Sequence, residues 1–342
     1  MSEQLGSTEP RATVVIPARD AEDLVGETVA GLAHASCPLQ VIVVDDGSVD
    51  RTGEVAAQAG AEVVRAAGDG PARARNLGCA RARADVLVFT DADCRPTPGF
   101  VEALLAPLVD PEIAGVKGAY LTEQRSLTAR FVQQEYEERY RRMARRRFID
   151  FVDTYACAYR KPVFDAVGGF DERYRLPSTE DQELSFRIAA TGARMVFAPE
   201  ARVVHRHADT LLGYARKKAK IGRFKVATLR RHPSKAVDDA HTPGTLKLQL
   251  LLGPLVVLAP VAVMVLVWAG APSWASLACA APPALFLLSC LPFTLCALRA
   301  DPAVGILTPA FCLVRALALG WGVVRGLLAE LGGGVLPEEQ PA

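Results

Sequence analysis

One stretch of ten residues, 85–94, decides the fold of this chain, and it reads DVLVFTDADC. The apolar run Val86 to Phe89 is too short for a helix and rich in β-forming residues, so it predicts a buried strand. Asp91 and Asp93 follow directly after its C-terminal end, where ligands bind in open α/β sheets. Both carboxylates lie on the same side of an extended backbone, and such a pair suits a hard divalent cation. On this stretch alone, a solvated turn explains the two acids equally well.

The sequence before this stretch alternates between strand-like and helix-like segments. Strands are expected at 13–16, 39–44 and 61–64, and helices at 24–32, up to about 60, and at 72–83. Strands that alternate with helices predict a parallel sheet joined by crossover helices. The sequence DDGS at 45–48 places a second carboxylate pair at the C-terminal end of a strand.

An NAD-type Rossmann site is a poor match for this pattern. Such a site requires Gly-x-Gly-x-x-Gly after the first strand. Here that strand ends in PARD at 17–20, with no glycine before Gly26. The acids at 45–46 can still accept hydrogen bonds from a nucleotide base or ribose.

Two further sets of basic side chains could belong to a binding site: two arginines before the opening stretch and a histidine well after it. Residues 70–78 open a helix that places Arg73 and Arg75 near its start, which the helix dipole disfavours unless an anionic ligand lies nearby. Solvent-facing arginines are the alternative. His205 ends a later strand, either as a third metal ligand beside the carboxylates or as a hydrogen-bonded surface histidine.

The remainder of the soluble part continues the α/β pattern. Helices are expected at 98–108, 127–148 and 161–167, and strands at 113–120, 151–159, 195–198 and 201–204. Glu180 and Asp181 begin one more helix, where either Ser178 with Asp181 or Thr179 with Gln182 fits a capping box. The same two acids could instead aim one carboxylate into a cleft.

Six short motifs, taken together, resemble the family 2 glycosyltransferases with the GT-A nucleotide-sugar-binding fold. They follow the family's order and spacing across about residues 12–225. They read VVIPARD at 14–20, VVDDGS at 43–48, ARNLG at 74–78, TDAD at 90–93, GGFD at 168–171 and ED at 180–181. The resemblance implies an α/β GT-A domain with a mostly parallel central sheet, followed by an all-α transmembrane region.

The resemblance also implies a donor site for a nucleotide-diphosphate sugar. Its residues would be Pro17, Ala18, Arg19, Asp46, Arg75, Asp91, Ala92 and Asp93. Asp46 would accept hydrogen bonds from the nucleotide base, with Arg75 nearby. Asp91 would contact the ribose or a metal-bound water. Asp93 would bind Mn²⁺ or Mg²⁺ bridging the diphosphate, with Asp91 as a further ligand. His205, from its place at a strand end near these carboxylates, is the third candidate metal ligand.

The family's catalytic base corresponds to Asp181, with Glu180 beside it. A single carboxylate that removes the acceptor's hydroxyl proton during direct attack on the anomeric carbon predicts inversion. A divalent cation would neutralise the charge of the diphosphate leaving group. The expected activity is a metal-dependent, inverting transfer of one hexose to a lipid-linked or membrane-proximal glycan acceptor of the cell envelope.

One departure from the family bears on the product. Processive polysaccharide synthases carry Gln-x-x-Arg-Trp late in the catalytic domain, whereas residues 214–224 here read YARKKAKIGRF, without Gln or Trp. This difference favours single-sugar transfer over a processive synthase. A catalytically inactive, membrane-bound scaffold that binds nucleotide sugars is a second alternative, and the intact acids Asp46, Asp91, Asp93 and Asp181 argue against it.

The C-terminal part is strongly apolar and predicts two or three transmembrane helices. Residues 246–269 and 274–298 can each span about 30 Å of hydrocarbon. A third candidate, 303–328, has Arg315 in its middle and Arg325 near its end, so it either packs inward, lies at the interface or does not cross. The basic segment 216–235 precedes the first span, so the positive-inside rule places the catalytic domain in the cytosol. We therefore expect a multi-pass protein of the inner (plasma) membrane in contact with membrane lipids.

The expected domain order is a disordered N-terminus at 1–11, a GT-A catalytic domain at 12–235, a membrane domain at 236–329 and a flexible tail at 330–342. The first eleven residues hold no apolar segment typical of a secretory signal. The chain has 39 Lys and Arg against 38 Asp and Glu, which excludes the basic excess of a general nucleic-acid binder. Its eight cysteines lack any Cys-x-x-Cys spacing, so no zinc or disulfide framework is implied.

Overall fold

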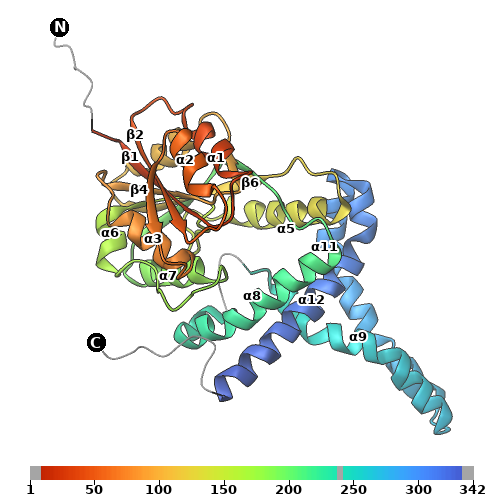
Figure 1. The fold of residues 1–342 in the computed structure, drawn as a ribbon. Coiled ribbons are helices and arrows are strands. Elements are labelled where there is room, and N and C mark those ends of the chain that lie inside the picture. Colours follow the sequence, from red (N-terminus) through yellow and green to blue (C-terminus); the bar gives the residue numbers. More distant parts are fainter. Residues whose placement is uncertain (1–8, 237–241, 333–342) are drawn as a thin grey trace.

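The fold is taken from a computed structural model that describes residues 9–236 and 242–332. The disorder expected at the N-terminus and the flexible tail expected at 330–342 fall almost entirely outside the described residues. An α/β domain occupies the first two thirds of the chain, and long helices follow it (Figure 1). The fold class expected from the sequence is therefore confirmed.

An eight-stranded mixed sheet forms the centre of the α/β domain, in the order β3-β2-β1-β4-β7-β6-β8-β5. The strands β3-β2-β1-β4 are parallel, as the alternating pattern predicts, whereas β7 is antiparallel to both β4 and β6. β8 runs parallel to β6 and antiparallel to β5. The strands are β1 Ala12–Ala18, β2 Leu39–Asp46, β3 Glu62–Ala66, β4 Val86–Thr90, β5 Cys94–Pro96, β6 Ile113–Leu121, β7 Ala156–Arg160 and β8 Arg194–His205.

Helices cover both faces of this sheet because its central strands are apolar on both sides. Val15 of β1 packs into one core and its neighbours Val14 and Ile16 into the other, as strand alternation requires. The helices of this part are α1 Val25–Leu32, α2 Thr52–Gln58, α3 Pro71–Cys79, α4 Phe100–Leu105, α5 Leu127–Met143, α6 Lys161–Ala166, α7 Glu180–Ala190 and α8 Leu211–Arg231.

Several boundaries differ from the sequence expectation. The helix expected at 98–108 is α4 followed by a 3₁₀ turn at Ala106–Val109, which contains Pro107. The two short strands expected at 195–198 and 201–204 are one strand, β8, with an irregularity after Phe197 in its pairing with β6. The three-residue β5 was not expected, because its strand conformation depends on pairing with β8. The helix expected at 127–148 ends at Met143.

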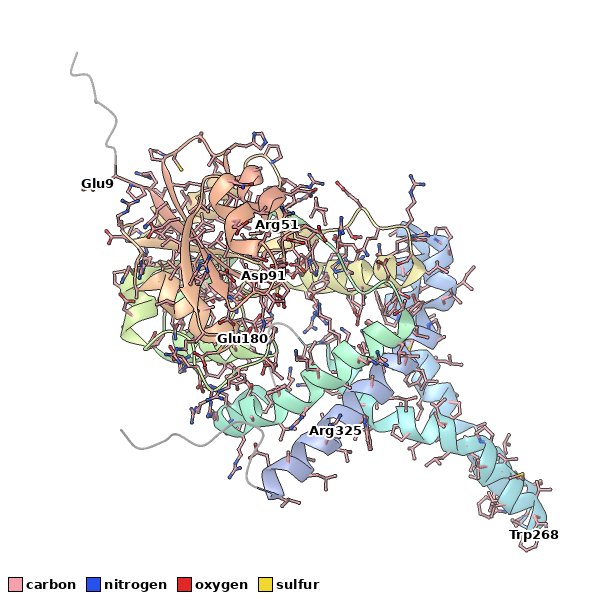
Figure 2. The ribbon with its side chains drawn as sticks, in the orientation of Figure 1. Glu9, Arg51, Asp91, Glu180, Trp268 and Arg325 are labelled. Atoms are coloured by element: carbon pink, nitrogen blue, oxygen red, sulfur yellow. The ribbon has the colours of Figure 1, made fainter. Side chains whose placement is uncertain are left out.

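Three of the C-terminal helical segments are long and apolar enough to cross a membrane. α9 Gly244–Trp268 contains Pro254 and Pro260, and α10 Ser273–Ala278 leads into α11 Ala281–Ala300, which returns beside α9. These helices form an arm that projects away from the α/β domain, with Trp268 at its tip (Figure 2).

The last helix, α12 Pro302–Leu331, does not follow that arm but runs beside α8 (Figure 1). Close approach of the two backbones requires glycine on both helices. A Cβ on Gly222 of α8 would lie 2.4 Å from the Leu319 carbonyl oxygen, and a Cβ on Gly322 would lie 2.0 Å from the Ala219 carbonyl oxygen. The backbones of α8 and α12 are therefore in direct contact at these glycines, and α12 packs against α8 and α5 at the end of the α/β domain.

Candidate active site

Asp91 and Asp93 lie in the turn between β4 and β5, at the C-terminal end of the parallel half of the sheet. Figure 2 shows Asp91 and Glu180 close to each other on the side of the α/β domain that faces α8. The prediction that a buried strand delivers the two acids is confirmed, since β4 is buried from Leu87 to Thr90. The turn after this strand is thus the centre of the candidate site.

Arg75 joins the two halves of this site. Its guanidinium is buried and donates to Asp91 Oδ1 at 2.8 Å and to Glu180 Oε1 at 3.1 Å. Burial alone would lower the pKa of Arg75, but the charges of Asp91 and Glu180 outweigh it and raise that pKa. The arginine therefore holds the start of α7 against the turn after β4, and its positive charge near the start of α3 is matched by two carboxylates.

Asp46 is also buried, and its carboxylate organises the loop before α3. It accepts hydrogen bonds from the backbone amides of Gly68, Asp69 and Gly70 at 3.1, 3.1 and 2.8 Å. Gly70 has a φ of 105°, and a Cβ there would lie 2.2 Å from the Arg175 carbonyl oxygen, so only glycine fits. The predicted contact of Asp46 with a nucleotide base stays a prediction.

The two acids at the start of α7 have different surroundings. Glu180 is buried and engaged, because it accepts from Arg75 and from the Ser178 amide at 2.7 Å. Asp181 is partly exposed and accepts from the Gln182 amide at 2.7 Å. Burial and the neighbouring Glu180 charge raise the pKa of Asp181 to about 7, against the opposing effect of Arg75. The surroundings of Asp181 therefore favour its protonated form more than those of a solvent-exposed carboxyl would.

The predicted capping box at this helix is wrong. Thr179 is the N-cap residue, but its side chain makes no capping hydrogen bond. Its hydroxyl instead lies 2.8 Å from that of Thr228 on α8. The start of α7 is consequently fixed by tertiary contacts and by Arg75, not by a local cap.

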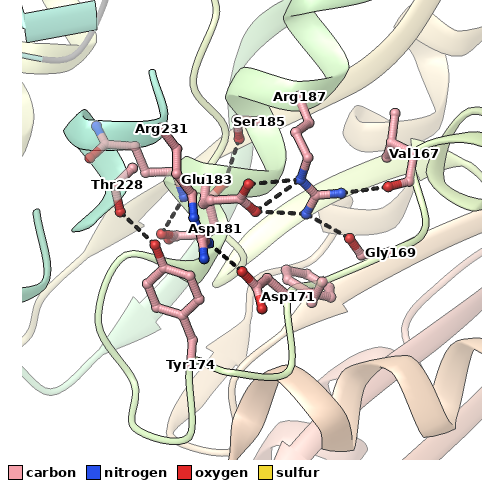
Figure 3. A network of polar contacts seen from close by, with 12 residues as sticks. Val167, Gly169, Asp171, Tyr174, Asp181, Glu183, Ser185, Arg187, Thr228 and Arg231 are labelled. Carbon is pink, nitrogen blue, oxygen red and sulfur yellow. Dashed lines mark hydrogen bonds and ion pairs between the residues drawn. The ribbon is translucent and has the colours of Figure 1, made fainter. Parts of the chain in front are cut away.

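A polar network behind Asp181 fixes the rest of α7 (Figure 3). Arg187 pairs with Glu183 at 2.7 Å and donates to the carbonyl oxygens of Val167 and Gly169 at 2.6 and 2.7 Å. The Ser185 hydroxyl donates to the Asp181 carbonyl oxygen at 2.7 Å. The helix that carries Asp181 is therefore tied to the loop that precedes it.

Two residues at the site had no role in the sequence interpretation. Asn76, inside the ARNLG motif, clamps Phe170, donating to its carbonyl oxygen and accepting from its amide, both at 2.9 Å. Lys117 of β6 is fully buried; it pairs with Asp153 and lies 3.1 Å from the Tyr155 hydroxyl. Burial lowers the pKa of Lys117 to about 7 against the effect of the Asp181 charge. In the sequence, the feature that could have drawn attention to Lys117 is that it is a charged residue within an otherwise apolar strand.

The predicted donor-site residues at the end of β1 form a supported loop. Ala18 is buried and Arg19 is exposed. Asp20 has a φ of 48°. Its carboxylate accepts a hydrogen bond from the Val49 amide at 2.9 Å, and its own amide donates to the Ser48 hydroxyl at 3.0 Å. Ala92 is buried, and its carbonyl oxygen accepts from the Thr28 hydroxyl at 2.8 Å. The predicted donor contacts of Pro17, Ala18, Arg19 and Ala92 stay predictions.

The three predicted metal ligands separate into two groups. Asp91 turns to Arg75, whereas Asp93 Oδ2 lies 3.4 Å from Nδ1 of His205 on β8. Burial would raise the pKa of Asp93, but the hydrogen bond and charge of His205 lower it. Both residues line a pocket of about 570 Å³ that also contains Glu27 and Arg206. A carboxylate beside an imidazole nitrogen, here Nδ1 of His205, fits a divalent cation. Within residues 9–236 and 242–332, the buried Nε2 of the same ring has no hydrogen-bond partner.

With this geometry in hand, comparison with known proteins identifies the domain. Residues 13–168 match the model of the family described as "Glycosyl transferase family 2". These residues form a glycosyl transferase family 2 domain. The match spans β1 to α6, so it includes Asp46, Arg75, Asp91 and Asp93 but ends before Asp181 and His205.

Relatives of this family 2 domain extend the comparison beyond residue 168. The chain is 32% identical over 257 residues to the pre-mycofactocin glycosyltransferase of Mycobacterium tuberculosis, covering 72% of this chain and 53% of that protein. It is 29% identical over 212 residues to the probable glycosyltransferase YdaM of Bacillus subtilis, covering 56% and 50%. The chain thus spans about half the length of the curated relatives it matches.

A solved structure shares the fold over nearly the whole chain. It is the mannosyltransferase PcManGT from Pyrobaculum calidifontis in complex with GDP-Man and Mn²⁺, with a TM-score of 0.58 and 21% identity. The match covers 94% of this chain and 88% of that one. The family 2 domain therefore has the GT-A fold expected from the motifs, followed by C-terminal helices.

Proposed function

We propose that this chain is an inverting glycosyltransferase that passes one sugar, a hexose, from a nucleotide-diphosphate donor to an acceptor at the membrane. The observation that carries the proposal is the placement of Arg75. Its contacts with Asp91 and Glu180 bring the donor-side turn after β4 next to Asp181 at the start of α7. Family 2 membership supports the reaction class.

Asp181 is the general base of this proposal. As the acceptor oxygen bonds to the anomeric carbon, the bond from that carbon to the diphosphate breaks, and the acceptor's proton passes to the Asp181 carboxylate. A base works best with a pKa near the working pH, and that of Asp181 is raised to about 7. Glu180 is already engaged by Arg75 and the Ser178 amide, so we assign it a positioning role.

Asp93 and His205 would hold the divalent cation, Mn²⁺ or Mg²⁺. Asp91 would lie on the nucleotide side, where its ion pair with Arg75 orients it. When bound, the cation would offset negative charge on the diphosphate leaving group. The donor set of carboxylate and imidazole supports this assignment. A related fold that binds GDP-Man and Mn²⁺ is consistent with it.

Donor binding tests the proposal directly. We expect one of a panel of UDP, GDP and dTDP sugars to bind the detergent-solubilised protein in a Mn²⁺-dependent manner, measured by calorimetry. The Asp93→Ala variant should weaken this binding by at least about tenfold, because it removes an anionic ligand.

The matched control is Asp85→Ala. Asp85 is exposed and directly precedes the N-terminal end of β4, away from the candidate site. This variant should bind the donor as the wild type does. If none of the panel bound to the folded wild type, or if Asp93→Ala bound equally well, the proposed donor site would be wrong.

The acceptor is proposed to be lipid-linked or membrane-proximal, because Thr179 at the start of α7 contacts Thr228 of α8, and α8 packs along the apolar helix α12. We infer that α9 and α11 are the two spans and that α12 lies in the plane of the membrane surface. Residues 216–235 are strongly basic and precede α9, which supports a cytosolic α/β domain.

Contacts along the whole of α12 support its in-plane position. At its start Asp301 pairs with Arg130 of α5 at 2.7 Å, and near its end Glu330 pairs with Arg230 of α8. A straight helix of this length is about 45 Å long. If it crossed the bilayer, its two ends would lie on opposite sides, and both could not contact the α/β domain. The outward face of α12 is apolar and exposed at Ile306, Trp321, Val324, Leu327 and Leu328, as in interfacial helices.

This arrangement predicts the location of the C-terminus. A green fluorescent protein fused after Ala342 should fluoresce, and alkaline phosphatase at the same position should be inactive, because two spans return the chain to the cytosol. As the control, a reporter inserted in the turn at 269–272, between α9 and α10, should give the opposite pattern. Active phosphatase at the C-terminus would mean that α12 crosses the membrane.

A further inference from the structure

A third donor lies beside Asp93 and His205, and it is a thiol. Cys94 Sγ is 3.5 Å from Asp93 Oδ1 and 3.7 Å from His205 Nδ1. We propose that Asp93, Cys94 and His205 form a tetrahedral oxygen, sulfur and nitrogen site that binds Zn²⁺ in preference to Mn²⁺ or Mg²⁺. This inference deepens the metal-site part of the proposed function and rests on it.

The spacing of the three donors matches a tetrahedral zinc centre. Zinc bonds sulfur at about 2.3 Å and nitrogen or oxygen at about 2.1 Å. At a tetrahedral angle these lengths place the donor atoms about 3.4–3.6 Å apart. The Asp93–His205, Asp93–Cys94 and Cys94–His205 separations are 3.4, 3.5 and 3.7 Å, with the two aspartate contacts made by its two oxygens. Only small shifts would bring the donors onto one ion.

The fold holds these donors in place by regular pairing. Cys94 of β5 is the register partner of His205 on β8, so their side chains lie side by side. The ring of Tyr120 stacks on that of His205 with centroids 4.5 Å apart. Sites on strands with packed side chains are more precise than sites on mobile loops. Strand pairing therefore fixes Cys94 and His205, and Asp93 lies in the turn directly before β5.

The chemistry of the donors favours a soft borderline ion. Thiolate ligands favour zinc, whereas Mn²⁺ and Mg²⁺ prefer oxygen ligands. On binding, the Cys94 thiol would lose its proton to solvent as the sulfur–zinc bond forms. Asp93 is about 41% exposed and lines the pocket, so an ion held by the three donors would be reached from the pocket, as in zinc sites that keep one open position. Zn²⁺ would then compete with the ion that supports donor binding.

The alternative is that Cys94 serves only as a small apolar side chain of the core, which is the usual role of a buried cysteine. It is fully buried within one of the two cores of the sheet. The two interpretations differ in one observable, which is a direct bond between sulfur and the metal. Cobalt reports such a bond, because a Co²⁺–thiolate complex has an intense near-ultraviolet charge-transfer absorption.

The test is a Co²⁺ titration of the full chain in detergent, followed by Zn²⁺ competition. The wild type should develop the charge-transfer band together with the visible bands of tetrahedral cobalt, and Zn²⁺ should abolish both. Cys94→Ser should lose the charge-transfer band and bind Zn²⁺ at least about tenfold more weakly. Cys79→Ser changes a buried cysteine of α3 that lies in the other core of the sheet; it is the matched control and should behave as the wild type.

The outcomes separate this inference from the proposed function. Mn²⁺-dependent donor binding without a charge-transfer band in the wild type would overturn the thiolate site and leave the glycosyltransferase proposal standing. A band that persists unchanged in Cys94→Ser would also overturn it, since the sulfur would belong to another cysteine. Failure of Mn²⁺-dependent donor binding would instead count against the proposed function.

Discussion

Replacing Asp181 with asparagine is expected to lower kcat by about 10²–10⁴-fold, the usual contribution of a general base, while donor affinity is unchanged. Asparagine keeps the size of the side chain and an oxygen that can accept from the Gln182 amide, as Asp181 does at 2.7 Å. What it loses is the ability to take a proton from the acceptor. The measurement is release of nucleoside diphosphate from the bound donor in the presence of membrane lipid extract.

The pH dependence of the wild-type rate provides a second test of Asp181 as the base. A base acts in its deprotonated form, so a raised pKa moves the onset of activity to higher pH. The pKa of Asp181 is raised from 3.8 to about 7, and the rate should therefore rise with pH up to about 7 and level off above it. The residual activity of Asp181→Asn should not show this rise.

Glu180→Gln is the matched variant on the neighbouring residue. It leaves Arg75 with one charged partner in place of two, so we expect lower thermal stability and a smaller loss of rate, with the pH profile retained. A folded Asp181→Asn protein with full activity, or a Glu180→Gln protein that alone loses the pH-dependent rise, would show that the base assignment is wrong.

The contrast between these two acids shows what the sequence could and could not predict. The buried strand β4 and the acids after it follow from a local apolar run and from strand alternation, so residues 85–94 were sufficient. The partners of Arg75 were not accessible in this way, because Glu180 lies 105 residues from it. Likewise, Cys94 meets His205 only through the pairing of β5 with β8. Local patterns predict elements, and the pairing of distant elements decides which side chains meet.

The membrane part illustrates the same limit. A hydropathy pattern measures how apolar a segment is, and α12 satisfies that measure as α9 does. It does not report whether both ends of the helix contact the same domain, as Asp301 and Glu330 do. Arg315 in the middle of the segment and Arg325 near its end were the sequence signals that α12 differs from a simple span.

The partner of Arg315 is Glu135, and this contact leads to a large expected effect on stability. Glu135 of α5 is buried and accepts from Arg315 at 2.8 Å and from the Tyr214 hydroxyl at 3.0 Å, and Lys218 of α8 lies 3.0 Å from it. Arg315 also donates to Gln249 of α9 at 2.7 Å. One carboxylate thus joins α5, α8 and α12, and through Arg315 also α9.

Glu135→Gln should destabilise the protein by about 3–5 kcal/mol, because it leaves Arg315 and Lys218 as buried cations without a counter-charge. For a domain of this size that corresponds to a fall of roughly 10 °C in Tm, measured by thermal unfolding in detergent. Burial would raise the pKa of Glu135, but Lys218 and Arg315 lower it from 4.5 to about 2. A lowered carboxyl pKa contributes stability above its unfolded value, so the contribution of Glu135 should be lost as pH falls from about 4.5 to about 2.

Two further variants separate the buried charge from the contact itself. Glu330→Gln removes a carboxylate whose partner Arg230 is largely exposed, and such pairs contribute about 1 kcal/mol or less. Replacing Glu135, Lys218 and Arg315 together by methionine should recover much of the stability, because it removes the unpaired charges while keeping apolar volume. If Glu135→Gln unfolded at the wild-type temperature, the cluster would not hold these helices together, and the in-plane position of α12 would depend on its ends and its glycine contacts with α8 alone.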